Sequence, residues 1–199
     1  MRMTRAGSGA LLLDCEDQEQ VFQLYERLRE DPRLADVVPG DRTLMVISDH
    51  AEALSDAALL REARGPSQAP ARTAEPVVVK VRYDGPDLAE AAELAGTSVE
   101  GLVAAHTGSP WTAQFLGFCP GFAYLVNPGA GLAVPRRQSP RARIPAGAVA
   151  LGAEYSAVYP MATPGGWQLI GTADTPMWDL ERDPPSLLSP GSLVRFVAA

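Results

Sequence analysis

The chain has 199 residues, of which 46% are hydrophobic and 21% are charged, so it can bury a core and is not disordered throughout. Its net charge of −7 argues against nucleic acid as a partner, because neutralising phosphates requires a basic face. The two cysteines are too few for a disulfide scaffold or a structural zinc site. No apolar run is long enough for a signal peptide or a membrane span, which predicts a cytoplasmic protein with no membrane partner.

The first part of the chain alternates strand and helix patterns. Ala10–Asp14 has the composition of a short buried strand, and apolar residues then recur at helical spacing over residues 21–28. Residues 36–48 have the composition of a hairpin, and residues 54–61 mark a second helix. This order predicts a ferredoxin-like α/β domain over residues 1–75, whose closing strand is either missing or lies further along the chain.

The second part begins after a linker rich in Pro, Ala, Ser and Thr at residues 66–76. A strand is expected from Val77 to Tyr83, then a short helix over residues 87–95 and another that begins with a capping box of Thr97 and Glu100.

From Trp111 onward, short apolar segments alternate with Pro and Gly, which predicts an antiparallel β-barrel or sandwich. The expected strands include residues 149–152, 158–159, 167–170, 177–180 and 193–197. Overall the sequence predicts an α+β protein whose second domain, residues 76–199, is mostly β.

Several catalytic motifs are absent. The sequence has no glycine-rich phosphate loop, dinucleotide fingerprint, H-E-x-x-H, C-x-x-C or G-x-S-x-G, which does not support autonomous ATP, zinc or serine-esterase chemistry. His50 begins a predicted helix and is interpreted as a solvated terminus. His106 lies on the apolar face at the end of a helix, where the helix dipole favours its protonated form. It is either a helix-end residue that donates to a last-turn carbonyl or a polar member of a site. No catalytic residue and no metal ligand is identified.

Three segments have the composition of a binding site. Residues 117–125 mix glycine, proline and aromatics, which fits either a bent core strand or a wall of rings. Four arginines lie between prolines at residues 135–145, and such loops hold guanidinium groups in place for an anion, although sixteen arginines against one lysine also fits a general bias. Residues 163–167 form a turn that allows close approach to a ligand or is simply a tight hairpin. The candidate site residues are Arg136, Arg137, Arg141, His106, Phe118, Pro120, Gly121, Phe122, Tyr124, Thr163, Pro164, Gly165, Gly166 and Trp167.

Three strings together carry a resemblance to a known family. They are G-F-C-P-G-F-A-Y-L (117–125), P-R-R-Q-S-P-R-A-R-I-P-A-G-A-V-A-L (135–151) and Y-P-M-A-T-P-G-G-W-Q-L-I-G-T (159–172). All three resemble the KipI family, also called allophanate hydrolase subunit 1 or the B subunit of 5-oxoprolinase. The resemblance covers residues 83–197 well, including Gly85-Pro86-Asp87-Leu88. The chain departs from the family pattern at residues 82–84, at Ala148 in place of serine, and at residues 171–173, where an arginine is absent.

The resemblance implies a cyclophilin-like barrel and an enzyme subunit. Such proteins work with a KipA-type subunit (the C subunit of 5-oxoprolinase, or allophanate hydrolase subunit 2) and with a LamB/YcsF-type protein, the A subunit. The complex opens 5-oxoproline to glutamate at the expense of ATP, which implies ATP as the cofactor of the assembly and a small anionic amide as substrate. The same pair of domains is found in the urea and allophanate pathway.

Two functions of different classes are therefore weighed. The first is an enzyme subunit whose arginines hold the substrate carboxylate or a phosphorylated intermediate, with proton transfer chiefly from partner subunits. The second is a regulatory protein that inhibits autophosphorylation of a histidine kinase, as one member of the family does. Peptidyl-prolyl isomerase activity rests on barrel analogy alone.

Overall fold

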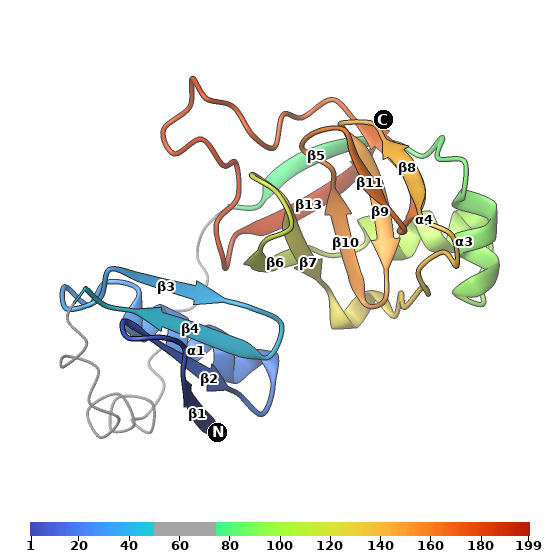
Figure 1. Cartoon of the computed structure of the whole chain (residues 1–199). Coiled ribbons are helices and arrows are strands. Elements are labelled where there is room, and N and C mark those ends of the chain that lie inside the picture. Colours follow the sequence, from blue (N-terminus) through green and yellow to red (C-terminus); the bar gives the residue numbers. More distant parts are fainter. Residues whose placement is uncertain (50–74) are drawn as a thin grey trace. The chain divides into compact units, whose positions relative to one another are not determined.

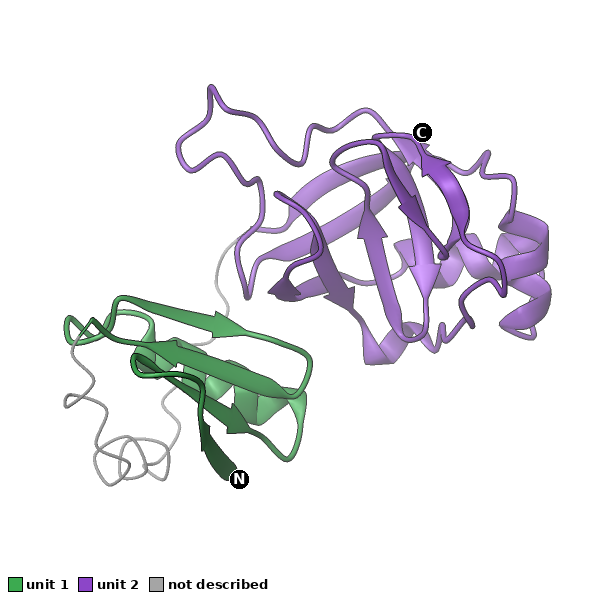
Figure 2. Cartoon of the chain, viewed as in Figure 1, with its two compact units in different colours: residues 1–73 green, residues 74–199 purple. Residues whose placement is uncertain are grey.

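The computed structural model describes residues 1–49 and 75–199, and the chain divides into two compact units, Met1–Thr73 and Ala74–Ala199 (Figure 2). The helix expected at residues 54–61, His50 and most of the linker at residues 66–76 lie outside the described residues. None of the helices in the described part of the chain is long and apolar enough to cross a membrane.

Unit 1 is a four-stranded antiparallel sheet with a helix packed on one face (Figure 1). Its elements are β1 (Arg2–Arg5), β2 (Ala10–Asp14), α1 (Gln18–Leu28), β3 (Asp36–Pro39) and β4 (Thr43–Ile47), and the strand order is β1-β2-β4-β3. The predicted strand, helix and hairpin are confirmed. Strand β1 was not predicted, and it occupies the sheet edge beside β2.

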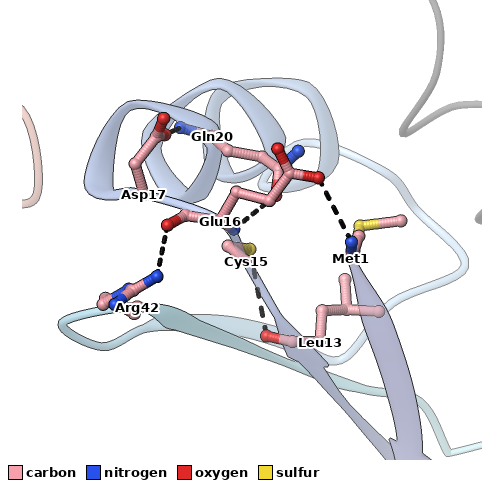
Figure 3. Close-up of polar contacts among 7 residues, drawn as sticks. All are labelled: Met1, Leu13, Cys15, Glu16, Asp17, Gln20 and Arg42. Carbon is pink, nitrogen blue, oxygen red and sulfur yellow. Dashed lines mark hydrogen bonds and ion pairs between the residues drawn. The ribbon is translucent and has the colours of Figure 1, made fainter.

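The junction between β2 and α1 is held by polar contacts to the backbone (Figure 3). The Asp17 carboxylate accepts a hydrogen bond from the backbone N–H of Gln20 at 2.8 Å and so caps the helix. The guanidinium of Arg42 donates to the carbonyl of Glu16, whose own N–H donates to the Gln20 side chain at 2.9 Å. Burial raises the pKa of the neighbouring Cys15 thiol, so this cysteine is a protonated core residue rather than a nucleophile.

Unit 2 is built around a closed seven-stranded barrel, with strand order β10-β7-β6-β13-β5-β12-β9. The strands are β5 (Val77–Arg82), β6 (Trp111–Leu116), β7 (Ala123–Val126), β9 (Ala148–Gly152), β10 (Tyr155–Val158), β12 (Gln168–Ala173) and β13 (Leu193–Ala198). Helices α3 (Leu88–Leu94) and α4 (Val99–Thr107) pack on β12 and β13, respectively. A 3₁₀ turn, Pro128–Ala130, follows β7, and β8 (Arg141–Ile144) pairs with β11 (Thr163–Gly165) as a separate two-stranded sheet.

The structure corrects three details of the sequence predictions. The barrel is not wholly antiparallel, because β13 pairs with β5 in parallel. Residues 177–180 do not form a strand and contribute only an isolated bridge between Trp178 and Ser186. Helix α4 is capped by Ser98, whose hydroxyl accepts from Gly101 N–H at 3.1 Å, and not by Thr97.

Strand β9 separates two cores because both of its faces are buried. Val149 and Leu151 pack inside the barrel, whereas Ala148 and Ala150 pack on its outer face against the aromatic cluster. This double burial explains why the strand is a continuous apolar run. The outer cluster is where the candidate site lies.

Candidate functional site

A cavity of about 340 Å³ opens on the outer face of the barrel. Its walls come from the β6–β7 turn, the loop before β8, the end of β10 and the turn between β11 and β12. The lining residues are Phe118, Phe122, Tyr124, Arg136, Arg137, Pro140, Tyr159, Gly165, Gly166 and Trp167. Its size and mixture of aromatic and cationic groups are typical of a site for a small molecule.

The aromatic wall is a set of edge-to-face contacts centred on Phe122. Its ring lies 5.2 Å from Tyr159 and 5.7 Å from Trp167, in T-shaped geometry. Two glycines make room for this arrangement: a Cβ on Gly152 would lie 2.6 Å from the Trp167 ring, and one on Gly165 would lie 2.7 Å from the Tyr159 hydroxyl. The shape of the cavity therefore depends on glycines in β9 and β11.

The turn between β6 and β7 brings Phe118 to the cavity rim in a strained conformation. Phe118 has φ of 67° and its side chain is 60% exposed. Gly121 also has a positive φ, 77°, and a Cβ there would lie 2.8 Å from Trp178. A non-glycine residue held at positive φ with its ring in solvent is more typical of a binding position than of core packing.

Arg136 is the guanidinium that faces the aromatic wall. Its Cζ lies 5.8 Å from the centre of the Trp167 ring, a cation–π contact. Burial, together with the neighbouring Tyr124, raises the pKa of Tyr159 to about 12, although the Arg136 charge opposes the shift. Both tyrosine hydroxyls therefore stay protonated at neutral pH and offer hydrogen-bond donors beside a cation.

Arg137 and Arg141 are bound to a carboxylate instead of pointing freely at a ligand. Asp87, at the N-terminus of α3, is 3% exposed and accepts hydrogen bonds from Arg137 Nη1 at 2.9 Å and Arg141 Nη2 at 2.6 Å. It also accepts from the backbone N–H of Leu169 at 2.7 Å. Arg137 Nε, Arg141 Nη1 and Gln168 Oε1 are buried without a partner among the described residues.

The structure brings together eight of the fourteen predicted site residues. The cavity is lined by Phe118, Phe122, Tyr124, Arg136, Arg137, Gly165, Gly166 and Trp167. Pro120, Gly121, Thr163, Pro164 and Arg141 belong to the same segments but do not line it, and His106 lies elsewhere. Sequence reasoning missed Tyr159, Pro140 and Asp87; for Asp87 the signal was present in Gly85-Pro86-Asp87-Leu88, which was noted only as part of the resemblance.

His106 is a core residue of the barrel. Its ring is fully buried, stacks on Phe196 at 4.2 Å, and hydrogen-bonds to the Tyr83 hydroxyl at 2.7 Å through Nδ1 and to the Ser156 hydroxyl at 2.8 Å through Nε2. A neutral imidazole has one donor and one acceptor, which the two hydroxyls match. Burial lowers the pKa of His106 to about 3. The expectation that the helix dipole keeps it protonated is therefore wrong, because desolvation outweighs the dipole.

The lowered pKa of His106 predicts a pH-dependent stability. Between pH 6.5 and about 3 the unfolded chain binds a proton at His106 that the folded chain excludes, so stability falls as the pH falls through this window. Lowering the pH from 7 to 5 is expected to reduce the free energy of unfolding by about 2 kcal/mol through His106. Urea unfolding of the wild type and of His106→Asn at both pH values measures the difference, because the two proteins share every other titratable group. Equal pH slopes in the two proteins would contradict the buried neutral state.

Other parts of the described chain are weaker candidates for a binding site. A second hollow, about 490 Å³, lies over β5 and the end of β12, where Arg82 pairs with Asp174 at 2.9 Å, and it contains none of the predicted site residues. Within residues 1–49 and 75–199, no group of three or more His, Cys, Asp and Glu side chains is placed to hold a metal ion.

Comparisons with known proteins give close relatives. The chain is 39% identical to the B subunit of 5-oxoprolinase from Escherichia coli O157:H7 over 202 residues, which cover 96% of this chain and 93% of that protein. The crystal structure of TTHA0988 superposes with a TM-score of 0.80 and 35% identity over 96% of this chain, but this chain spans only 40% of that protein. Urea amidolyase of Kluyveromyces lactis, at 14% identity and a TM-score of 0.72 over 99% of this chain and 15% of that protein, shares the fold.

The family described as carboxyltransferase domain, subdomain C and D, matches residues 1–188, which is most of the chain. Together with the curated relative, this match confirms the resemblance to the KipI family that the glycine, proline and arginine motifs carry. The chain therefore belongs to the carboxyltransferase-domain family, subdomains C and D.

Proposed function

We propose that this chain is the B subunit of an ATP-dependent 5-oxoprolinase and that its outer cavity binds the carboxylate of 5-oxo-L-proline. The observation that carries the proposal is Arg136, an arginine over the Trp167 ring in a cavity walled by aromatic side chains. A flat lactam ring fits against such walls, and its carboxylate requires one cation. The name of the 39% identical relative supports the same reaction.

In this proposal the chain binds substrate but does not hydrolyse it alone. The cavity holds hydroxyl and guanidinium donors, which orient a carboxylate and a carbonyl but do not abstract protons at neutral pH. The groups that move protons belong to partner subunits, one of KipA type and one of LamB/YcsF type, in a cytoplasmic complex. The cavity residues do not fit a nucleoside triphosphate, because they present one unpaired arginine and no phosphate loop, so ATP binds elsewhere in the assembly.

We also propose a fold type for each of the two units. Residues 1–75 are assigned to a ferredoxin-like domain, in which β1 takes the edge position of the closing strand, and residues 76–199 to a cyclophilin-like domain. The alternative functions are a regulator of a histidine kinase, a prolyl isomerase and a subunit of the allophanate pathway. None of them has a described contact or cavity that favours it over the oxoprolinase.

The test is 5-oxoproline-dependent ATP hydrolysis by this chain co-expressed with its KipA-type and LamB-type partners. We expect activity only when all three are present. Arg136→Ala is expected to lower kcat/KM about tenfold to a hundredfold, the equivalent of one charged hydrogen bond. Arg143→Ala is the matched control, since Arg143 is an exposed arginine of β8 that does not line the cavity. Full activity without this chain, or equal losses in the two variants, would refute the proposal.

A further inference from the structure

The charges around the cavity are distributed unequally. Three arginines approach it from one loop and the strand that follows, yet two of them share one buried carboxylate, Asp87. The carboxylate of the exposed Glu90 also lies 3.7 Å from Arg137 Nη1. Within the described residues no carboxylate lies within ion-pair distance of Arg136. Of the three, Arg136 is thus the arginine that has no carboxylate partner in the described part of the chain, whereas Arg137 and Arg141 are ion-paired.

Asp87 is placed to keep this distribution fixed. Its second oxygen accepts from the backbone N–H of Leu169, so it cannot turn away with the arginines. The loop is also tied at its backbone, because Arg137 N–H donates to the Gly166 carbonyl at 2.7 Å, and Arg141 pairs in register with Gly165. The loop that carries Arg136 and Arg137 and the turn at Gly165 and Gly166 are thus held together beside Asp87.

Arg136 is oriented differently from its two neighbours. Arg136 lines the same cavity as Tyr124 and Tyr159, and its charge opposes the rise in the pKa of both tyrosines. The same side chain lies over Trp167. A negative group that enters the cavity meets a wall that contains Arg136, Tyr124 and Tyr159, whereas Arg137 and Arg141 are already ion-paired with Asp87.

From this arrangement we infer that Asp87 is a positioning residue that sets the charge specificity of the cavity, which takes a singly charged carboxylate in preference to a doubly charged anion. The second charge of a dianion would be desolvated without a compensating cation, whereas one carboxylate is matched by Arg136. The identity of that carboxylate as 5-oxo-L-proline rests on the proposed function; the charge preference does not.

The test is equilibrium binding of 5-oxo-L-proline, acetate and sulfate to the full chain at constant ionic strength, by isothermal titration. The wild type is expected to bind either 5-oxo-L-proline or acetate at least about tenfold more tightly than sulfate. The second negative charge of sulfate would be uncompensated in a partly dry cavity, and this accounts for a difference of that size. In Asp87→Asn the paired guanidinium groups gain one net positive charge, and the carboxylate-to-sulfate ratio is expected to shift toward sulfate by at least about tenfold. A role in folding alone would weaken the binding of all three anions equally.

Asp84→Asn is the matched control, because it removes the same charge from the same connection before α3, three residues earlier. Asp84 is exposed and accepts from Thr172, away from the cavity. Its ratio should match that of the wild type. If Asp87→Asn does not fold, Arg136→Gln and Arg141→Gln decide the matter: the first should abolish carboxylate binding and the second should leave it within about threefold.

Three results would overturn the inference: a wild type that binds sulfate as tightly as the carboxylates or binds no anion, an unchanged ratio in folded Asp87→Asn, or equal losses in the two arginine variants. Failure of the proposed function is separate. Binding of acetate but not 5-oxo-L-proline, or an assembled complex without 5-oxoproline-dependent ATP hydrolysis, would remove the oxoprolinase assignment and leave the charge rule intact.

Discussion

Replacing Gly85 by alanine is expected to destabilise unit 2 by about 3 kcal/mol or more, the upper end of what overpacking costs. A Cβ at this position would lie 2.2 Å from the Leu169 carbonyl oxygen and 2.4 Å from the Ile170 carbonyl carbon. Both are backbone atoms of β12, and they cannot rotate away as a side chain could. The close approach is also what lets the Asp87 N–H donate to the Leu169 carbonyl at 3.0 Å.

Gly117→Ala is the matched control for Gly85→Ala. Its Cβ would make only an ordinary contact, 3.9 Å from the Tyr124 ring, so we expect no loss of stability and a gain of up to about 1 kcal/mol from the stiffer unfolded chain. The three tryptophans, Trp111, Trp167 and Trp178, all belong to unit 2, so their fluorescence during urea unfolding reports on this unit alone. A Gly85→Ala protein as stable as the control would show that the backbone at Gly85 does not approach β12 as described.

Replacing His106 by alanine is expected to cost about 3 to 5 kcal/mol of the free energy of unfolding of unit 2. The change leaves a cavity beside Phe196 and removes the partner of two hydroxyls, the part-buried one of Tyr83 and the buried one of Ser156. Urea unfolding followed by tryptophan fluorescence measures the loss.

Ser156→Ala provides the comparison for His106→Ala. It removes only the 2.8 Å hydrogen bond to Nε2 and leaves the stacking of the imidazole intact, so its cost should be about 1 to 3 kcal/mol. A smaller loss in His106→Ala than in Ser156→Ala would mean that the imidazole contributes little to the packing of the barrel.

The cavity could be predicted from the sequence where its residues lie close together in the chain. Phe122, Tyr124, Arg136 and Trp167 were all expected, because glycine and proline beside aromatics and arginines indicate an exposed, shaped surface. The pairing of Arg137 and Arg141 with Asp87 could not be predicted, since it joins residues 50 and 54 positions apart. For the same reason, helix position alone misjudged His106, whose protonation depends on strands that pack over it.

The fold was predictable where hydrophobic periodicity is strong, as in β2, α1 and β5. The short strands β1 (R-M-T-R), β8 (R-A-R-I) and β11 (T-P-G) have at most four residues each and, apart from Ile144, no buried residue. Their pairing therefore depends on their partners rather than on their own composition. Conversely, residues 177–180 do not form a strand, because Met177 packs in the core whereas Leu180 is 77% exposed.

The parallel pairing of β13 with β5 has a consequence for how the barrel is assembled. In the strand order, β13 lies between β5 and β6, and it joins Val194 to Val77 across 117 residues of chain. Until β13 is in place, β5 and β6 each have an unpaired edge, and strands of other chains can pair with such edges. Because such a distant contact forms late, closure of the barrel is expected to be the slow step of folding, and the aggregation-prone interval lasts until the strand at residues 193–198 docks.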